Sequence, residues 1–127
     1  MGKVIERIKL KSLFDPNQSV EVDACIDTGA TMLVLPQNIV NELKLMKVRE
    51  TTVKYANNQR QQKSIYTGLL MEIKGRIGGF EVLAEEEGTE PLVGQIVLEA
   101  LDLVVEPRTH SLIPNPRSPE MPMVEIL

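Results

Sequence analysis

Short runs in which apolar and polar residues alternate recur along this chain, and residues typical of turns separate them. From residue 20 to residue 26, every second residue is apolar and the others are Glu, Asp and Cys. A period of two is the pattern of a β-strand that buries one face. Many such strands, with turns at regular intervals, predict a small all-β barrel or sandwich.

The same pattern places the individual elements. Pro36 suits the first position of a short helix, because its fixed φ is already helical and its missing N–H is not needed there. A second short helix is expected where an apolar pattern with helical spacing follows Gly94. Strands are expected over residues 3–13, 19–26, 32–35, 48–55, 61–73, 80–84, 91–94 and 103–106, and short helices over 36–43 and 95–101.

Turn residues mark the connections between these elements. Residues 15–18 contain Pro and Asn and predict a turn between the first two strands. Asn57-Asn58 tolerates positive φ, which predicts a β-hairpin between 48–55 and 61–73. Residues 74–79 are expected to turn, with Gly78-Gly79 part of that turn, and the acidic run 85–87 is expected to be a solvated loop.

Length and composition fit one domain with an aliphatic core. The chain has 127 residues, with two Phe, two Tyr and no Trp. Residues 1–113 are expected to form the domain. Residues 114–127 carry prolines at 114, 116, 119 and 122 and are expected to form an extended C-terminal tail.

Charge and hydropathy argue against several partners. A formal net charge of −4 gives no reason to expect nucleic acid or an anionic membrane as a partner. The chain shows no signal peptide and no apolar run near about eighteen residues, so we expect a soluble, cytoplasmic protein. Cys25 is the only cysteine, which excludes a disulfide within one chain and fits a reducing compartment.

The chain also lacks the residues that several kinds of active site need. One Cys and one His cannot build a structural zinc site of the Cys/His type within one chain. A Cys25–His110 catalytic pair is disfavoured, because His110 lies in a turn-like polar patch (108–111) and Cys25 lies in an apolar strand. No phosphate loop or dinucleotide fingerprint is present. We therefore expect no metal and no cofactor.

One carboxylate stands out by its surroundings. Asp27 ends the apolar strand 19–26, and Thr28-Gly29-Ala30 follows it directly before a second apolar run. Glycine tolerates positive φ and lets backbone approach closely, so the triplet predicts a tight loop that holds Asp27 between two apolar segments. Two interpretations are open: a functional carboxylate, or a turn residue whose side chain accepts hydrogen bonds from nearby N–H groups.

A second motif lies near the other end of the chain. Pro91-Leu92-Val93-Gly94-Gln95 leads into the expected helix with Leu98 and Leu101. With the strand into Asp27-Thr28-Gly29-Ala30 and the run 33–36, this motif resembles the retropepsin-like aspartic proteases over about residues 3–116. The runs 101–107 and 112–116 are similar to small prokaryotic members rather than viral ones.

The resemblance implies a homodimeric, all-β, retropepsin-like closed barrel with one or two short helices. Peptide hydrolysis by carboxylates needs one group that takes a proton from water and one that hydrogen-bonds the carbonyl. A close pair does this because two like charges cannot both ionise there. Only Asp27 lies in such a triplet, so the pair would be Asp27 from two copies across a two-fold axis. Thr28 would hold the two loops together, and Gly29 would let the backbone approach the substrate.

The resemblance also suggests where substrate binds. The family's flap would correspond to Val53–Gln62, with its tip at Asn57-Asn58-Gln59, and Tyr55 could face the cleft or pack in the strand. Thr31 and Gln95 are neutral where viral members carry paired charges, so a Thr31–Gln95 hydrogen bond or a looser contact is expected. The residues expected to support the loop or bind substrate are Thr28, Gly29, Ala30, Thr31, Tyr55, Asn57, Asn58, Gln59, Val93 and Gly94.

The expected activity is that of an aspartic endopeptidase, a hydrolase acting on a peptide or protein substrate. Ala30 replaces the Ser of pepsin-like members, so the ionised pair loses a hydroxyl donor and activity at mildly acidic to near-neutral pH is expected. The alternatives are a catalytically weak or inactive dimeric peptide-binding or scaffold module, and an unrelated β-barrel. Residues 123–127, at the end of the tail 114–127, either add an edge strand at the dimer interface or stay disordered.

Overall fold

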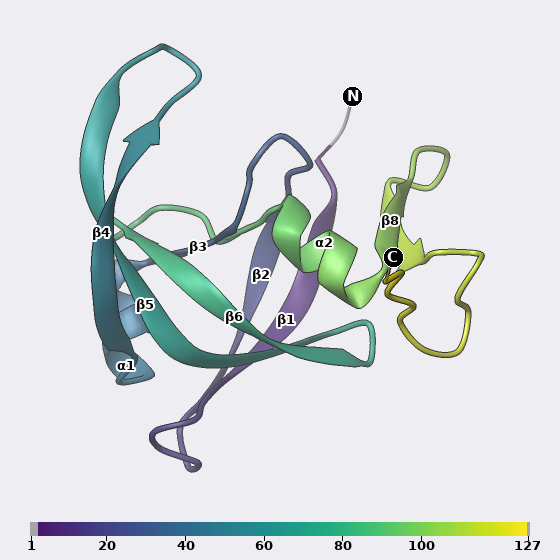
Figure 1. Ribbon diagram of the computed structural model, residues 1–127, viewed down its shortest axis with the longest axis horizontal. Helices are drawn as coiled ribbons and strands as arrows, with labels where there is room; N and C mark the ends of the chain where they lie inside the picture. The colour runs from purple at the N-terminus through teal and green to yellow at the C-terminus, as the bar shows by residue number, and fades with distance from the viewer. Residues whose placement is uncertain (1–2, 127) are drawn as a thin grey trace.

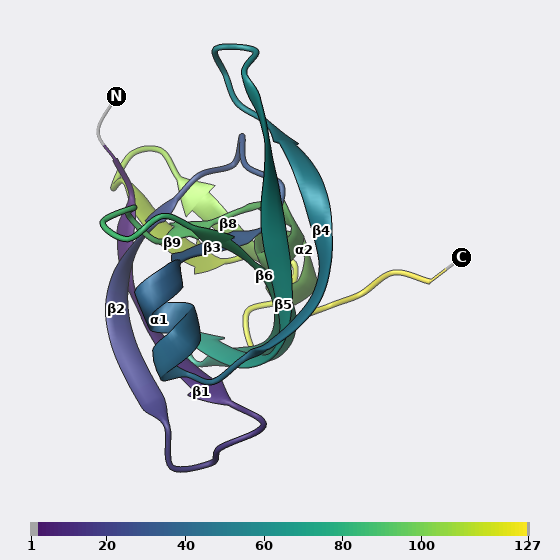
Figure 2. The same cartoon turned by 90° about the vertical axis from the view of Figure 1, so that its left-hand side faces the viewer.

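The computed structural model describes residues 3–126, and most of the regular structure is β (Figures 1 and 2). This confirms the all-β expectation at the level of fold class. Neither helix in this range is long and apolar enough to cross a membrane. The strands are β1 (Ile5–Ser12), β2 (Ser19–Ile26), β3 (Leu33–Pro36), β4 (Met46–Lys54), β5 (Arg60–Ile73), β6 (Arg76–Glu85), β7 (Leu92–Val93), β8 (Leu103–Glu106) and β9 (Ser111–Pro114), and the helices are α1 (Gln37–Glu42) and α2 (Gln95–Leu101).

One seven-stranded sheet, in the order β1-β2-β7-β3-β6-β5-β4, makes up the body of the protein. β5 also pairs with β1, so the pairings run in a ring from β1 through β2, β7, β3, β6 and β5 back to β1. β4 pairs only with β5 in the part of the chain that is described. Figure 1 shows the β4–β5 hairpin rising above the rest of the sheet. The hairpin predicted from Asn57-Asn58 is therefore confirmed, with Asn58 at a φ of 68°.

The short strand β7 decides where the Asp27 loop lies. It pairs in parallel with the end of β2, Cys25 opposite Leu92 and Ile26 opposite Val93, and in antiparallel with Val34 of β3. β2 and β3 are consecutive in sequence, yet β7 lies between them. The connection 27–32 must therefore cross the end of β7, where α2 begins.

The core is built from aliphatic side chains, as the scarcity of aromatic residues predicts. α2 contributes Val97, Leu98 and Leu101 to it, and α1 contributes Val40. Burial of this apolar surface is the main driving force for the fold. The largest fully buried side chains are Ile8, Leu10, Leu33, Leu35, Leu43, Leu69, Met71, Ile73, Leu112, Val40, Val82 and Val93.

Two expectations about turns in the second half of the chain are wrong. Gly78-Gly79 does not turn but lies within β6, opposite Met71 and Leu70 of β5. The turn is made by Lys74 and Gly75, whose φ values of 52° and 76° suit a tight hairpin. Ser111, which was expected in a turn-like patch, begins the unexpected strand β9.

β9 forms because its partner is available. β8 and β9 pair in antiparallel over four residues, with Val105 opposite Leu112, and Leu112 is fully buried. Pro114, which cannot donate to a ladder, is the last residue of the strand. Beyond it, residues 115–126 contain no helix or strand, and the chain turns at once, with the Ser118 N–H donating to the Asn115 carbonyl at 2.8 Å (Figure 2).

We predict that Leu35→Ala lowers the free energy of unfolding by about 2–5 kcal/mol, because it leaves a cavity at a fully buried position in β3. Met46→Ala, at a 55% exposed position of β4, is the control and should change stability by no more than about 0.5 kcal/mol. Urea denaturation of both variants measures the difference. Similar losses in the two variants would contradict the described core.

Candidate functional site

The Asp27 loop is held by its own hydrogen bonds and by β7. The Asp27 N–H donates to the Val93 carbonyl at 3.0 Å, and the Asp27 carbonyl accepts from the Ala30 N–H at 3.1 Å. The carboxylate oxygen Oδ1 accepts from the Gly29 N–H at 2.9 Å. The turn expected from Asp-Thr-Gly is therefore present, and the side chain of Asp27 caps it.

The second carboxylate oxygen of Asp27 is not used in this way. Within residues 3–126, Oδ2 accepts no hydrogen bond, and the side chain is only partly buried. An ionised carboxylate has room for several donors. The carboxylate can therefore hydrogen-bond a water molecule, a substrate or another carboxyl group while Oδ1 fixes its orientation.

The start of α2 packs against the back of the loop. The Gln95 N–H donates to the Ala30 carbonyl at 2.8 Å, and the Ile96 N–H donates to the Thr31 carbonyl at 2.9 Å. Gly94 precedes the helix with φ −95° and ψ −174°, which other residues also adopt. Its need for glycine is spatial, because an added Cβ would lie 2.5 Å from the Met32 carbonyl oxygen.

Thr31 and Gln95, for which a hydrogen bond or a looser contact was predicted, form no hydrogen bond with each other among the described residues. Among the described residues, the Gln95 side chain donates to Glu99 Oε1 at 3.3 Å rather than to Thr31. The loop and the helix are instead joined through the backbone, by the bonds from Gln95 and Ile96. A backbone link of this kind does not depend on the side chain at either position.

The loop lines one side of a large cleft, with a volume of about 910 Å³. The other walls come from the hairpin, from the second half of β6, and from the segment around β7 and the start of α2. Apolar and charged side chains both reach it. The lining residues are Asp27, Gly29, Ala30, Thr31, Met32, Leu33, Val34, Arg49, Thr51, Thr52, Val53, Lys54, Tyr55, Ala56, Ile65, Gly79, Phe80, Glu81, Leu83, Glu85, Thr89, Leu92, Ile96 and Val97.

The predicted site residues divide into three groups. The first lines the cleft: Asp27, Gly29, Ala30, Thr31 and Tyr55. The second, Val93 and Gly94, is buried behind the loop and supports it. The third, Thr28, Asn57, Asn58 and Gln59, is exposed and is not part of the cleft lining.

Sequence patterns do not single out most of the cleft lining. Met32, Leu92 and Ile96 are ordinary apolar positions in the sequence, and no motif surrounds Glu81. Alternation along β4 gives one indication of which strand face meets the cleft. Thr51 and Val53 occupy alternate positions of the sequence, and in the structure both are partly buried between exposed neighbours. The opposite wall is formed by strands that come later in the chain, so its identity depends on the fold.

A hydrogen-bonded carboxylate joins the hairpin to the opposite wall. Tyr55, just after β4, donates its hydroxyl to Glu85 Oε2 at 2.5 Å, and Lys63 of β5 lies 2.9 Å from Glu85 Oε1. The Lys63 and Glu85 side chains are each only 13% exposed. The expectation that Glu85 belongs to a solvated loop is therefore wrong, because two partners from the hairpin draw it into the structure.

These contacts shift both pKa values. Burial, together with the hydrogen bond to Glu85, raises the pKa of Tyr55 to about 12. Burial alone would raise the pKa of Glu85, but the hydrogen bonds from Tyr55 and Lys63 outweigh it and lower that pKa. Glu85 therefore stays ionised and Tyr55 stays protonated near neutral pH. Glu81 is likewise paired, with Arg49 at 2.7 Å.

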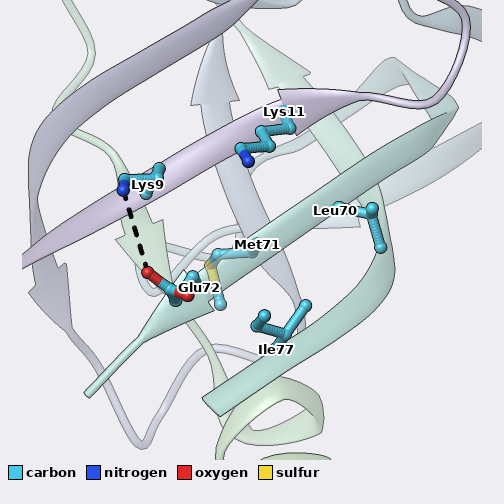
Figure 3. Close-up of a pocket in the computed structure, with 6 residues that line it drawn as sticks. All are labelled: Lys9, Lys11, Leu70, Met71, Glu72 and Ile77. Carbon is cyan, nitrogen blue, oxygen red and sulfur yellow. Dashed lines mark ion pairs between the residues drawn. The ribbon is translucent and has the colours of Figure 1, made fainter. Parts of the chain in front are cut away.

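A second, much smaller cavity of about 130 Å³ lies over β1, β5 and β6 (Figure 3). Lys9 and Glu72 lie on one side of it, with Nζ and Oε2 4.0 Å apart. Its small volume and its lining of paired charges and aliphatic groups do not suggest a catalytic site. The lining residues are Lys9, Lys11, Leu70, Met71, Glu72 and Ile77.

Within residues 3–126, no group of three or more His, Cys, Asp or Glu side chains is placed to hold a metal ion. No protein-family model matches the chain, and no curated protein matches it. The function must therefore be inferred from the residues of the site themselves.

We predict that Gly94→Ala lowers the free energy of unfolding by about 1–3 kcal/mol or more, because the new methyl group meets backbone atoms of Met32 and Ala30. Gly79→Ala is the control, since its Cβ would meet the nearest atoms at an ordinary 3.6 Å. Thermal unfolding compares the two. Equal stability of Gly94→Ala and wild type would contradict the close approach of loop and helix.

A second prediction concerns Tyr55 and Glu85. Tyr55→Phe should lower the free energy of unfolding at pH 7 by about 1.5 kcal/mol, the range for a hydrogen bond to a charged group. Because the pKa of Glu85 is lowered on folding, this stabilisation is present above about pH 4.3 and is lost as pH falls through the lower folded-state pKa.

Tyr66→Phe is the matched control for this prediction. The Tyr66 hydroxyl meets only the neutral Gln37 amide at 3.3 Å, so its smaller effect should not follow the titration of Glu85. Urea denaturation of wild type and both variants from about pH 7 to about pH 2 makes the comparison. A Tyr55→Phe effect that is constant over this range would count against the charged hydrogen bond.

Proposed function

We propose that the chain is one half of an aspartic endopeptidase, in which Asp27 from two copies forms the catalytic pair. One observation carries the proposal: Asp27 presents a carboxylate, oriented through Oδ1 and unbonded at Oδ2 among the described residues, to a cleft of about 910 Å³. A cleft of this volume is large enough for several residues of an extended peptide.

The other acids of the cleft support the need for a second copy. Glu81 is paired with Arg49 at 2.7 Å, and Glu85 is bonded to Tyr55 and Lys63. Neither is free to share a proton with Asp27. The chemistry needs two carboxyl groups about 3 Å apart. Symmetry would supply the second one, since an isologous contact near a two-fold axis brings a residue to its own mate.

The reaction then follows from the two carboxyl groups. The ionised carboxylate takes a proton from a water molecule, and the water oxygen attacks the carbonyl carbon of the peptide. The protonated carboxyl donates its hydrogen bond, and then its proton, to the carbonyl oxygen. The tetrahedral intermediate collapses as the C–N bond breaks: the nitrogen takes the proton that the first carboxylate removed from water, and one hydroxyl proton of the intermediate returns to the second carboxylate. This releases one carboxylic acid and one amine and restores the pair.

The walls of the cleft fit an extended substrate. Residues 51–56 of the hairpin all line the cleft, and the alternate ones Thr51, Val53 and Tyr55 are partly buried, which is the spacing of one face of an extended strand. Strand-like recognition of this kind combines backbone hydrogen bonds with alternating side-chain contacts. The ring of strand pairings is also compatible with the closed, retropepsin-like barrel that belongs to this proposal.

The alternative of a peptide-binding or scaffold module uses the same cleft without the chemistry. The hydrogen bond from Gly29 to Asp27 favours it to some degree, because a turn-capping Asp needs no other role. The two functions differ in what replacement of Asp27 does. A capping role predicts lost stability with binding retained, and a catalytic role predicts lost cleavage with stability retained.

We predict that Asp27→Asn cleaves a diverse peptide library about 10²- to 10⁴-fold more slowly than wild type, because Asn cannot exchange the proton. Asp23→Asn is the matched control, since Asp23 is an exposed carboxylate on the same strand, 3.2 Å from Arg7. Mass spectrometry of the peptides measures cleavage, and a statine-type transition-state inhibitor should block it. Sedimentation measures the fraction of dimer along a dilution series, and cleavage should be seen only at the concentrations where the chain is dimeric.

Equal cleavage by wild type and Asp27→Asn would eliminate the catalytic assignment, as would a wild-type protein that binds library peptides without cleaving any of them. Activity that is independent of dilution, in a protein that sediments as a monomer, would eliminate the shared pair. The first two outcomes distinguish an enzyme from a binding module, and the last tests separately whether catalysis needs a dimer.

A further inference from the structure

A buried carboxylate holds the C-terminal segment against the end of α2. Asp102 follows α2 in a left-handed conformation, with φ 54°, and is 5% exposed. Its Oδ1 accepts from Asn115 Nδ2 at 3.1 Å and from Arg117 Nη2 at 3.2 Å. Its Oδ2 accepts from Ser118 Oγ at 2.6 Å, from Arg117 Nε at 3.2 Å and from the Met123 N–H at 3.3 Å.

A buried arginine completes the arrangement from the other side. Arg76, the first residue of β6, is 7% exposed. Its Nη1 donates to the carbonyls of Leu101 at 2.8 Å and Asp102 at 3.0 Å, and its Nη2 donates to the Ser118 carbonyl. One guanidinium thus joins the end of the helix to the C-terminal segment, where the Asn115 N–H also donates to the Asp102 carbonyl at 2.9 Å. We call Arg76, Asp102, Arg117 and Ser118 the C-terminal clamp.

The charged groups of the clamp restrict how the end of α2 and the C-terminal segment are oriented toward each other. Burying charged groups is costly unless each is well hydrogen-bonded, and apolar residues of similar size hold segments together as well. Hydrogen bonds from Ser118 and then Arg117 hold the pKa of Asp102 well below its ordinary value, so it stays ionised. Directional bonds to a planar guanidinium and a carboxylate leave little freedom in how α2 ends.

The other end of the same helix supports the Asp27 loop. Gln95 and Ile96, at the start of α2, donate to the carbonyls of Ala30 and Thr31. α2 has only seven residues, so a tilt at its end displaces its first turn as well. Figure 1 shows α2 running between the side of the sheet near the Asp27 loop and the side that carries β8 and the C-terminal segment.

We infer that Arg76 and Asp102 are positioning residues: the clamp fixes the C-terminal end of α2 and, through the helix, the position of the Asp27 loop. The C-terminal segment from Asn115 to Met123 is on this account part of the active site's support rather than a dispensable tail. The mechanical part of the inference stands on the hydrogen bonds alone, and its catalytic consequence rests on the proposed function.

The mechanical part is tested by amide hydrogen exchange on the full chain. The variants are Arg76→Met, Asp102→Asn and Arg117→Met, and the control is Arg7→Met, which breaks an ion pair with side chains 59% and 67% exposed. Exchange at the Gln95 and Ile96 amides should accelerate about tenfold or more in the clamp variants and remain unchanged in Arg7→Met. The Arg117 side chain is 42% exposed, so its variant remains informative should Arg76→Met not fold.

Exchange that accelerates only at the Asn115, Ser118 and Met123 amides, with the helix start unchanged in Arg117→Met and Asp102→Asn, would overturn the inference. Such a result would reduce the clamp to a local anchor of the tail. Loss of protection at the helix start in Arg7→Met as well would overturn it too, because the effect would then not be specific to the clamp.

The catalytic consequence is tested by the kinetics of peptide cleavage. Arg117→Met and Asp102→Asn should lower kcat about tenfold while KM stays within about twofold, because the walls from the hairpin and β6 are unchanged and the displacement falls on the first turn of α2 and the Asp27 loop. Arg76→Lys should restore part of the kcat lost in Arg76→Met, since Lys keeps the charge but not the planar donors. A raised KM with unchanged kcat would overturn the positioning role.

The two proposals fail in different ways. A wild-type chain without peptidase activity refutes the proposed function, while the exchange experiment still decides whether the clamp positions the loop. An active wild type whose clamp variants keep full kcat refutes the positioning role and leaves the catalytic assignment of Asp27 intact.

Discussion

The close approach of the Asp27 loop to the start of α2 is the constraint on which the rest of the site depends. A strand of only two residues, β7, is inserted between β2 and β3, and the helix begins at once after Gly94. There is room for the loop to cross only because Gly94 has no side chain. The carboxylate is thus placed by backbone contacts between segments that are far apart in the chain, and these contacts need little help from neighbouring side chains.

Local patterns predict the parts of this arrangement that depend on local physics. The alternation over 19–26, the helix over 95–101 and the strand over 103–106 have the bounds that the sequence indicates. The Asp-Thr-Gly triplet indicates a tight loop because its capping bond, from Gly29 to Asp27, lies within three residues. Where the stabilising partner is a near neighbour in sequence, the pattern suffices.

Elsewhere the partner comes from a distant segment, and the sequence gives little indication of it. Gly78-Gly79 would turn in isolation, but pairing with β5 keeps it extended. Ser111–Pro114 becomes a strand because β8 offers an edge and the core accepts Leu112. Glu85 leaves the acidic run because Tyr55 and Lys63 reach it from the hairpin. The cleft could not be assembled from patterns for the same reason, since its walls come from strands that meet only in the fold.

Asp27, Glu85 and Asp102 differ in how many of their carboxylate oxygens accept hydrogen bonds or form ion pairs. Asp102 accepts hydrogen bonds on both oxygens and is buried, and Glu85 is bonded on both oxygens by residues of the hairpin. Such carboxylates serve structure, because their charge is compensated within the chain. Asp27 differs: among the described residues its side chain is bonded through one oxygen, by one backbone N–H, and is partly exposed in the cleft of about 910 Å³. A carboxylate that is oriented but not paired with a cation keeps an oxygen for a further hydrogen bond, and this is the physical ground for proposing Asp27, rather than its more elaborately bonded neighbours, as the catalytic group.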